Sequence, residues 1–477
     1  MSLRFGTDGV RGVAGTELTT ELALALGRAA ASVLTEAESG GRPSFLVGRD
    51  TRWSGPMLQA AFSAGLASEG VDVIDVGVLP TPGVAAMAAE RDVPAAVISA
   101  SHNPFADNGI KLLAAGGRKL TDAEEGTVED RLAAAGAASS AAGLGIGTVE
   151  GARLGRLTTD AGGRAWYCQR VVSALEGRSL EGVRVVIDCA NGAASATAGD
   201  ILAGAGVDVV QVLAATPDGT NINAACGSTD PGALAESVVA HGADAGLAFD
   251  GDADRVIAID NDGHVVDGDR LLALFATDLH SRRRLAGDTV VVTVMTNLGF
   301  HHAMRRAGIA VHQTPVGDRY VVEALDANGW SLGGEQSGHL IFRDLATTGD
   351  GVLSGLLLLD LLARHQRPLA ELASEAMVRL PQVLHNVAVR DHLGLVDAPE
   401  VWAEVRSIES EFGDTGRVVL RASGTERLVR VMVEATTEAQ AAAAVARLVA
   451  AVTRALGEPS PPPASPGARP DRPSPDG

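Results

Sequence analysis

Short runs of β-branched residues alternate with alanine- and leucine-rich stretches at helical spacing along most of this chain. The clearest series predicts strands over 45–48, 71–76 and 95–99, with helices over 56–68 and 83–90 between them. This order is typical of βαβ units and of parallel or mixed sheets.

A glycine that ends a helix just before a β-rich run recurs at Gly70, Gly206 and Gly308. The recurrence indicates one supersecondary plan used three times, although any α/β protein can end its helices in this way. Beyond Pro381 the pattern is that of a smaller α+β unit, with strands over 383–389, 418–420 and 428–435 and helices over 399–412 and 438–456.

The length of 477 residues leaves room for about three domains or more. The small-residue stretch 133–147 predicts a helix end followed by a linker, which would be the first boundary,. Asp262-Gly263 predicts a hairpin turn,. We expect α/β domains over 1–150, 151–256 and 257–375, an α+β domain over 376–457, and a disordered tail over 458–477, where eight prolines prevent packing,.

Charge and composition exclude several classes of partner. A formal net charge of −20 makes the surface repel polyanions, so no nucleic-acid partner is expected. Three cysteines without C-x-x-C spacing fit neither a disulfide framework nor a zinc knuckle, and they favour the reducing cytoplasm,. The most hydrophobic run, 352–363, is too short to span a bilayer and no signal peptide is evident, so no membrane partner is expected,.

Asp250, Asp252 and Asp254 follow an apolar strand at i, i+2 and i+4. In an extended backbone their carboxylates project to one side, and three oxygen ligands from so short a segment suit Mg²⁺. A calcium EF-hand loop would need Gly and Glu where Arg255 and Asn261 stand,. An aspartyl phosphohydrolase nucleophile of the D-x-D-x-[TV] type is a further alternative, although its last position is Asp254 here.

Ser101 begins a Ser-His-Asn-Pro segment at the end of a predicted strand, where loop residues face a ligand cleft. A serine needs a base to act as a nucleophile, and His102 is either such a base or a hydrogen-bonding residue of a turn. A phosphoserine here would carry about −1.5 to −2 charge and would supply the metal ligand that the three aspartates lack.

Lys111 is one of only two lysines among 39 basic residues. Unlike arginine, lysine can lose its proton when desolvated, and general acid or base catalysis requires that property. A surface ion pair is the ordinary alternative for a lysine.

Three further glycine-rich segments carry polar groups. The first is near the N-terminus and carries Arg11. The second is a turn that supplies groups for sugar hydroxyls or an amine, namely Glu335, Gln336 and Ser337. The third is either a phosphate nest or a solvated hairpin, and its donors are Arg421, Ser423, Gly424, Thr425 and Arg430,.

Together and in this order, these segments resemble the α-D-phosphohexomutase superfamily. The match runs from about Phe5 to Glu434, and the Glu-Gln-Ser turn looks like the glucosamine branch of that superfamily. The resemblance implies four domains around a central cleft: three similar three-layer α/β domains with mixed sheets and a C-terminal α+β domain. Ala422 and Arg427 depart from the family, which commonly has proline at both positions.

The resemblance also implies roles for single residues. It makes Ser101 the phosphoserine, which would hold one Mg²⁺ together with Asp250, Asp252 and Asp254. The remaining catalytic residues would be Arg11, Lys111, His102 and Arg255, with Arg11 stabilising charge and Lys111 transferring protons. Glu335, Gln336 and Ser337 would bind the sugar, and Arg421, Ser423, Gly424, Thr425 and Arg430 would bind its nontransferring phosphate.

The implied reaction interconverts glucosamine 6-phosphate and glucosamine 1-phosphate through glucosamine 1,6-bisphosphate, with that compound or glucose 1,6-bisphosphate as activator. It would supply UDP-N-acetylglucosamine for cell-wall synthesis. The alternatives are a glucose- or mannose-specific mutase of the same superfamily, an aspartyl phosphohydrolase, and a phosphosugar sensor without activity. A Ser/Thr kinase or autophosphorylation would first phosphorylate Ser101, and the chain would be a monomer or a homodimer.

Overall fold

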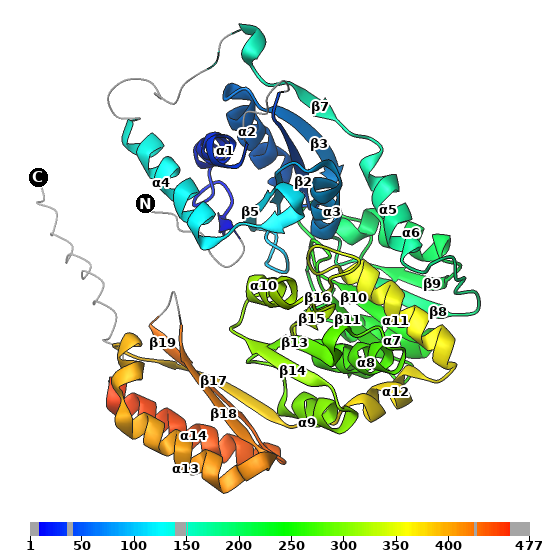
Figure 1. The fold of residues 1–477 in the computed structure, drawn as a ribbon, viewed down its shortest axis with the longest axis vertical. Coiled ribbons are helices and arrows are strands. Elements are labelled where there is room, and N and C mark those ends of the chain that lie inside the picture. Colours follow the sequence, from blue (N-terminus) through cyan, green and yellow to red (C-terminus); the bar gives the residue numbers. More distant parts are fainter. Residues whose placement is uncertain (1–8, 36–41, 139–148, 150, 424–426, 458–477) are drawn as a thin grey trace, which may run out of the picture. The chain divides into compact units, whose positions relative to one another are not determined.

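The chain forms two compact units, which the computed structural model describes over residues 9–35, 42–138, 149, 151–423 and 427–457 (Figure 1). The first unit contains Met1–Thr296 and Phe300–Val378, and the second contains Asn297–Gly299 and Arg379–Gly477. The predicted tail over 458–477 and most of the predicted linker lie outside the described residues.

Three sheets of the first unit repeat one four-strand plan. In each, the first strand lies between the second and the third and is parallel to both, and the fourth is antiparallel beside the third. In spatial order, the strands of the first sheet are β3 (Asp72–Val78), β2 (Ser44–Arg49), β4 (Ala95–Ile98) and β5 (Asp107–Ala114). Those of the second sheet are β9 (Asp208–Leu213), β8 (Arg184–Asp188), β10 (Ala245–Phe249) and β11 (Val256–Asp260). Those of the third sheet are β14 (Ala310–Thr314), β13 (Thr289–Thr293), β15 (Leu332–Gly334) and β16 (Leu340–Phe342). The single plan used three times, with mixed sheets, is therefore confirmed.

Short strands extend two of these sheets. They are β1 (Val10–Val13), β6 (Arg118–Lys119), β7 (Leu157–Thr159) and β12 (Val265–Val266). The second sheet therefore continues past residue 256, where we place a domain limit from sequence, because β11 pairs with β10 along its whole length. That limit remains a prediction for the domain as a whole.

Helices cover both faces of each sheet (Figure 1). In the first repeat they are α1 (Thr20–Leu34), α2 (Gly55–Ser68), α3 (Thr81–Arg91) and α4 (Asp122–Ala138). In the second they are α5 (Gly163–Ser173), α6 (Ala198–Gly204) and α7 (Gly232–His241), and in the third α8 (Gly268–Ser281), α9 (Leu298–Ala307), α10 (Asp318–Asn328), α11 (Gly351–His365) and α12 (Leu369–Ala376).

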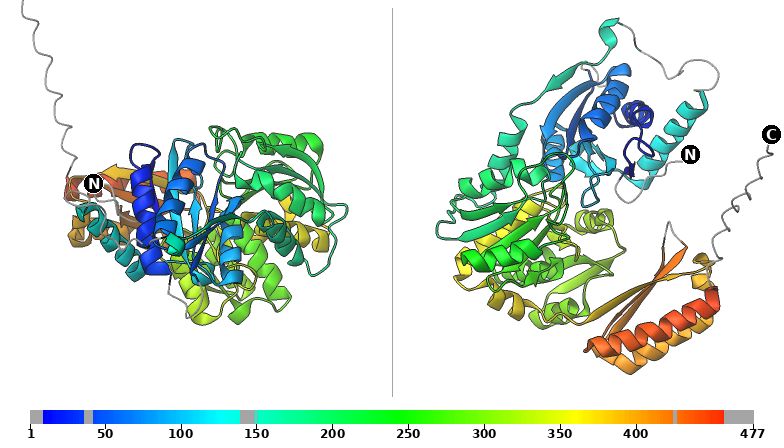
Figure 2. Two further views of the ribbon diagram at one scale, coloured as in Figure 1. Left: turned by 90° about the horizontal axis from the view of Figure 1, so that it is seen from above. Right: turned by 180° about the vertical axis from the view of Figure 1, so that it is seen from behind.

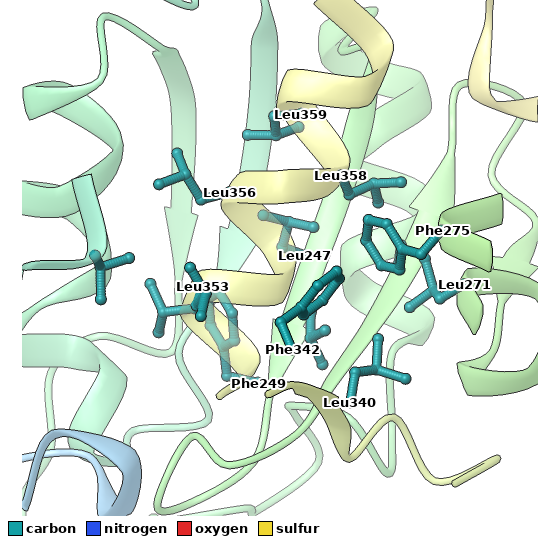
Figure 3. Packing of buried hydrophobic residues seen from close by; sticks show 14 of the residues in the cluster. Leu247, Phe249, Leu271, Phe275, Leu340, Phe342, Leu353, Leu356, Leu358 and Leu359 are labelled. Atoms are coloured by element: carbon teal, nitrogen blue, oxygen red, sulfur yellow. The ribbon is translucent and has the colours of Figure 1, made fainter. Parts of the chain in front are cut away.

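Strand β2 shows how the sequence builds three layers. Side chains alternate across a sheet, so Phe45 and Val47 pack with α1 and α2 on one face, while Leu46 packs with α3 on the other. The second and third repeats share a continuous core along α11, where Leu353 and Leu356 meet side chains of both sheets (Figure 3).

The second unit is an α+β domain with an antiparallel sheet of order β17-β19-β18. Two helices pack side by side on this sheet (Figure 2). The elements are β17 (Gln382–Ala388), α13 (Pro399–Phe412), β18 (Arg417–Ala422), β19 (Leu428–Glu434) and α14 (Glu438–Leu456).

Helix α14 is long and apolar enough to cross a membrane, judged by length and composition among the described residues alone. Its apolar face, including Ala444, Leu448 and Val452, is buried against the sheet of the second unit. This packing is that of a core helix.

The predicted elements match the structure closely. The hairpin around Gly263 forms between β11 and β12, and Cys168, Cys189 and Cys226 are free thiols. In the stretch 133–147, which we predict as a helix end followed by a linker, residues 133–138 form the end of α4. The rest of this stretch lies outside the described residues.

Candidate functional site

In each repeat the connection between the third and fourth strands carries polar side chains. Ser101 follows β4, Asp250 follows β10 and Glu335 follows β15. Because the three repeats share one topology, these three loops are equivalent in position. Each begins at the carboxyl end of a parallel strand, which is where open α/β sheets bind ligands.

The Ser101 loop and the Asp250 loop meet in the first unit. The hydroxyl of Ser101 donates to Asp250 Oδ2 at 2.5 Å, across 149 positions in the chain. Ser101 is fully buried and adopts a left-handed backbone conformation with φ 52°. A serine in this region of φ/ψ space is strained, and surrounding contacts must therefore hold it.

Asp250, Asp252 and Asp254 form a compact buried cluster. One carboxylate oxygen of each lies within 4.8 Å of the others. The extended backbone that we expect for this segment is wrong, because residues 250–254 form a turn in which Ala253 has φ 56° and donates its N–H to Asp250 O. Convergence comes from the turn rather than from alternation along a strand.

The surroundings shift the pKa values of Asp250 and Asp254 in opposite directions. Burial, together with the charges of Asp254 and Asp252, raises the pKa of Asp250 well above its usual range. Burial acts in the same direction on Asp254, but Lys111 and His339 outweigh it and hold the pKa of Asp254 well below its usual range.

Lys111 lies on β5 and faces this cluster, not a surface partner. It is 5% exposed, and its Nζ lies 2.7 Å from Asp252 Oδ2 and 3.4 Å from Asp254 Oδ2. Thr81, at the start of α3, donates its hydroxyl to the same oxygen of Asp252 at 2.6 Å. Residues of the first repeat thus neutralise and orient the carboxylates of the second.

His102 and Arg255 form a second pair beside Ser101. The Arg255 Nη1 group lies 3.1 Å from His102 Nδ1, which lies 3.4 Å from the Ser101 hydroxyl. Burial and the charges of Arg255 and Arg11 lower the pKa of His102. The imidazole is therefore neutral at neutral pH and accepts a hydrogen bond from the guanidinium. The backbone of Arg11, on β1, lies opposite that of Gly109 on the antiparallel strand β5.

The third repeat contributes Glu335, Gln336 and Ser337, which are all half-buried. Glu335 Oε1 accepts a hydrogen bond from the backbone of Gly317 at 3.2 Å. The Ser337 hydroxyl is buried without a hydrogen-bond partner among the described residues.

Sequence reasoning missed His339, which lies directly after this turn. Its Nδ1 is 3.7 Å from Asp254 Oδ1 and its Nε2 is 3.3 Å from Asp318 Oδ2, and Lys119, the second lysine, pairs with Asp318 at 2.5 Å. Only the Ser-Gly-His sequence beside Glu335 could have indicated His339. The sequence gives no comparable signal for Asp318.

The predicted phosphate loop belongs to the second unit. Arg421 and Arg430 are directly opposite each other on β18 and β19, and Ser423 is buried and donates its N–H to Leu428 O at 2.9 Å. Gly424 and Thr425 lie outside the described residues.

The carboxylate cluster fits a divalent cation. Asp252 Oδ1 and Asp254 Oδ1 are buried and have no hydrogen-bond partner in the part of the chain that the structure describes. Buried carboxylates require a compensating charge, and an all-oxygen donor set suits Mg²⁺. The three aspartates that we single out from sequence are thus brought together in a form that could bind a metal.

Comparison with known proteins identifies the family. Models of the phosphoglucomutase/phosphomannomutase family match in four parts: its α/β/α domain I over residues 2–138, domain II over 165–263, domain III over 267–380 and the C-terminal domain over 384–451. The chain belongs to the phosphoglucomutase/phosphomannomutase family. The three α/β/α domains of that family correspond to the three repeats, and its C-terminal domain corresponds to the second unit.

Two curated relatives are named phosphoglucosamine mutase. A phosphoglucosamine mutase of Rhodococcus opacus is 53% identical over 437 residues, which cover 91% of this chain and 96% of that protein. A phosphoglucosamine mutase of Thermobifida fusca is 52% identical over 440 residues, covering 92% and 95%.

Solved structures of the family share the fold. A phosphoglucomutase/phosphomannomutase family protein of Burkholderia thailandensis has a TM-score of 0.77 at 27% identity, and the match covers 95% of this chain and 97% of that one. The N-acetylphosphoglucosamine mutase of Aspergillus fumigatus, solved with GlcNAc-6P and magnesium, has a TM-score of 0.66 at 19% identity over 96% of both chains.

Proposed function

We propose that this chain is a phosphoglucosamine mutase that interconverts glucosamine 6-phosphate and glucosamine 1-phosphate. The observation that carries the proposal is the 2.5 Å contact between the buried Ser101 hydroxyl and Asp250, which brings a nucleophile to a metal-binding cluster. The names of relatives at 52% to 53% identity support the substrate.

Asp250, Asp252 and Asp254 would hold one Mg²⁺ together with an oxygen of a phosphoryl group on Ser101. Bound there, Mg²⁺ would offset the negative charge that develops on the transferring phosphoryl group. Asp252 Oδ1 and Asp254 Oδ1, which accept no hydrogen bond from the described residues, support this assignment, and so does the magnesium in the Aspergillus fumigatus complex.

In the proposed cycle, the phosphoryl group on Ser101 moves to the free hydroxyl of the sugar phosphate. The bond between phosphorus and Ser101 Oγ breaks, a bond between phosphorus and the sugar oxygen forms, and the proton of the sugar hydroxyl leaves as Ser101 Oγ gains one. The resulting 1,6-bisphosphate turns over and returns its other phosphoryl group to Ser101 by the reverse step.

Side chains of the first two repeats would support this transfer. We assign proton transfer to Lys111, because its Nζ is buried beside the cluster, and charge stabilisation to Arg11 and Arg255. His102 would accept hydrogen bonds as a neutral imidazole, consistent with its contact with Arg255.

Substrate binding would divide between two regions. Glu335, Gln336 and Ser337 would bind the sugar. The buried Ser337 hydroxyl, which has no hydrogen-bond partner in the described part of the chain, supports that role. The phosphate that is not transferred would be bound by Arg421, Ser423, Gly424, Thr425 and Arg430.

The wider setting follows from the same proposal. The first phosphate on Ser101 would come from a Ser/Thr kinase, autophosphorylation or a sugar 1,6-bisphosphate. The product would lead to UDP-N-acetylglucosamine for the cell wall in the cytoplasm, and the chain would act as a monomer or homodimer.

The deciding experiment compares wild type with Ser101→Ala. The wild type should carry acid-stable phosphate on Ser101 by mass spectrometry and should isomerise glucosamine 6-phosphate, whereas Ser101→Ala should do neither, even with added glucose 1,6-bisphosphate. Ser374→Ala is a matched control, because the Ser374 hydroxyl is exposed on α12 and bonds only to Glu371 O. Full activity of Ser101→Ala would contradict the proposal.

The same assay tests the alternatives. A higher kcat/KM for glucose or mannose phosphates than for glucosamine phosphates would assign the chain to another activity of the family. Release of free phosphate through a hydroxylamine-labile acyl phosphate would indicate an aspartyl phosphohydrolase.

A further inference from the structure

The backbone of the Ser101 loop is held by a buried arginine of the first repeat. Arg52 is 1% exposed, and its guanidinium donates to Asp50 Oδ2 at 2.9 Å, which fixes its orientation. Among the described residues, its other N–H groups donate to backbone carbonyls of Ser101, Asn103, Pro104 and Asp107. Arg52 therefore supports the backbone of the loop.

Asn223, from the second repeat, donates to two of the same carbonyl oxygens. Its Nδ2 lies 2.9 Å from Ser101 O and 3.0 Å from Asn103 O, where Arg52 Nη2 lies at 2.9 and 2.8 Å. Asn223 adopts a left-handed conformation with φ 56°, which asparagine tolerates better than most residues. Two donors from two repeats thus converge on one pair of acceptors.

These contacts act on the strained residue of the loop. A fixed carbonyl fixes the orientation of the peptide plane that follows Ser101, while the N–H of Ser101 donates to Ser99 Oγ at 3.0 Å. With the backbone held on both sides at φ 52°, the hydroxyl is directed at Asp250 Oδ2. There is no spare room, because a Cβ on Gly251 would lie 2.4 Å from Ser101 O and 3.0 Å from Asn223 Nδ2.

We propose that Arg52 and Asn223 form a carbonyl clamp whose function is to position Ser101 Oγ for phosphoryl transfer. Both are positioning residues, because they act through the backbone of Ser101 and not on the reacting atoms. Arg52 holds the Ser101 loop from within the first repeat. Asn223 holds it from the second repeat, which also carries the three aspartates, so the position of Ser101 depends on both repeats. The proposal rests on the phosphoglucosamine mutase function proposed above.

The test uses Asn223→Asp in the full-length protein. Aspartate has the same shape as asparagine and tolerates the left-handed conformation. Its carboxylate cannot donate, so an acceptor oxygen would face the carbonyl oxygens of Ser101 and Asn103. Because small displacements of reacting groups are costly, we expect kcat to fall at least tenfold, while KM for glucosamine 6-phosphate stays within about twofold. Asn223→Ala, which removes both hydrogen bonds without adding charge, should show the same pattern with a smaller loss and carries the test if the aspartate variant does not fold.

Asn221→Asp is the matched control. Asn221 lies in the same loop, but its side-chain hydrogen bonds among the described residues stay within that loop. Its Nδ2 donates to Thr216 O, and its Oδ1 accepts from the N–H of Asp218. This variant should keep kcat and KM within about twofold of wild type. Equal losses in Asn221→Asp and Asn223→Asp would show that general loop integrity matters, and would overturn the clamp.

A second readout separates the clamp from the proposed function. Dephosphorylated protein is incubated with glucose 1,6-bisphosphate, and phosphate on Ser101 is followed by intact mass. Labelling should be slowed in Asn223→Asp and unchanged in Asn221→Asp. Normal labelling and normal kcat in both Asn223 variants, with unchanged melting temperatures, would overturn the clamp. Wild type that is labelled but fails to isomerise glucosamine phosphates would overturn the proposed function and leave the labelling comparison to decide the clamp.

Discussion

The Ser101 loop and the Asp250 loop occupy the same place in the same strand plan, yet they are built in opposite ways. The Ser101 loop presents the neutral hydroxyl of Ser101, and the backbone carbonyl of Ser101 accepts hydrogen bonds from the side chains of Arg52 and Asn223. The Asp250 loop carries three buried carboxylates, and its backbone packs directly against glycines of neighbouring segments. A Cβ on Gly192 would lie 2.3 Å from Gly251 O, and one on Gly351 would lie 2.3 Å from Arg255 O.

This difference shows how one topology supports two chemical tasks. The first loop uses side-chain donors to hold the strained backbone of Ser101. The second uses close backbone packing to concentrate negative charge, which is then balanced from outside by Lys111. The strand plan fixes where each loop lies, and the loop sequence decides what it holds.

The comparison predicts that forcing the two loops apart has the largest effect. In Gly251→Ala the new methyl would collide with the carbonyl of Ser101, which is backbone and cannot move aside cheaply. A displacement of about 1 Å can cost about 100-fold in rate, so we expect kcat to fall by at least that factor. Gly199→Ala on α6 is the control, because a Cβ there meets nothing within 4 Å. Comparable activity of Gly251→Ala and Gly199→Ala would show that loop contact is unimportant.

Removing one charge from the Asp250 loop should have the next largest effect. Asp252→Asn lowers the charge of the cluster and weakens the contact with Lys111, so we expect Mg²⁺ affinity and kcat each to fall at least about tenfold. Calorimetric titration with Mg²⁺ and steady-state kinetics measure the two effects.

Asp260→Asn is the matched control for this charge removal. Asp260 is also buried, but its carboxylate accepts hydrogen bonds from the backbone N–H groups of Asp262 and His264 in the hairpin turn. If Asp260→Asn weakens Mg²⁺ binding as much as Asp252→Asn, the cluster is not the metal site.

A smaller and different effect is expected outside both loops. Arg421→Ala in the second unit should raise KM about tenfold, the loss expected for one charge-assisted hydrogen bond, and should leave kcat nearly unchanged. Arg447→Ala, which removes an exposed arginine that pairs with Glu404 and Glu411 on the same unit, should change neither parameter. A fall in kcat with constant KM for Arg421→Ala would contradict its assignment to phosphate binding.

The last prediction concerns the pH dependence of stability at a residue that supports the Asp250 loop. Gly351, the first residue of α11, donates its N–H to Ala253 O at 3.0 Å, and the preceding Asp350 caps that helix and accepts the hydroxyl of Tyr167 at 3.0 Å. Burial raises the pKa of Asp350 from 3.8 to about 6.

The sign of the pH dependence follows from this raised pKa. The folded protein binds the proton more tightly than the unfolded chain, so the stabilisation is complete below about pH 4 and is lost as pH rises through 6. Asp350→Asn removes this dependence, and its stability relative to wild type should increase by up to about 3 kcal/mol between pH 4 and pH 7. Melting temperatures at several pH values measure it, and a pH-independent difference between the two proteins would rule out Asp350 as the titrating group.

Local patterns predict much of this molecule. The strand and helix periods locate β2, α2 and β3 to within a few residues, and the D-x-D-x-D spacing identifies a cluster that could hold a metal. Asn223 and His339 escape the same reasoning because their contacts, to Ser101 and Asp254, span 122 positions and more than 80 positions. No sequence pattern at Asn223 or His339 shows that its partner lies in another repeat, and the turn at Ala253 could not be predicted from the alternation of aspartates.

The order of the repeats along the chain has a consequence for biosynthesis. Ser101 precedes Asp250 by 149 positions, which a ribosome covers in about 7 to 30 seconds. During that interval the first sheet can fold, but its serine has no carboxylate to receive the hydroxyl proton. A nascent polypeptide that stalls before residue 250 would carry Ser101 without the three aspartates that we propose as the cation site.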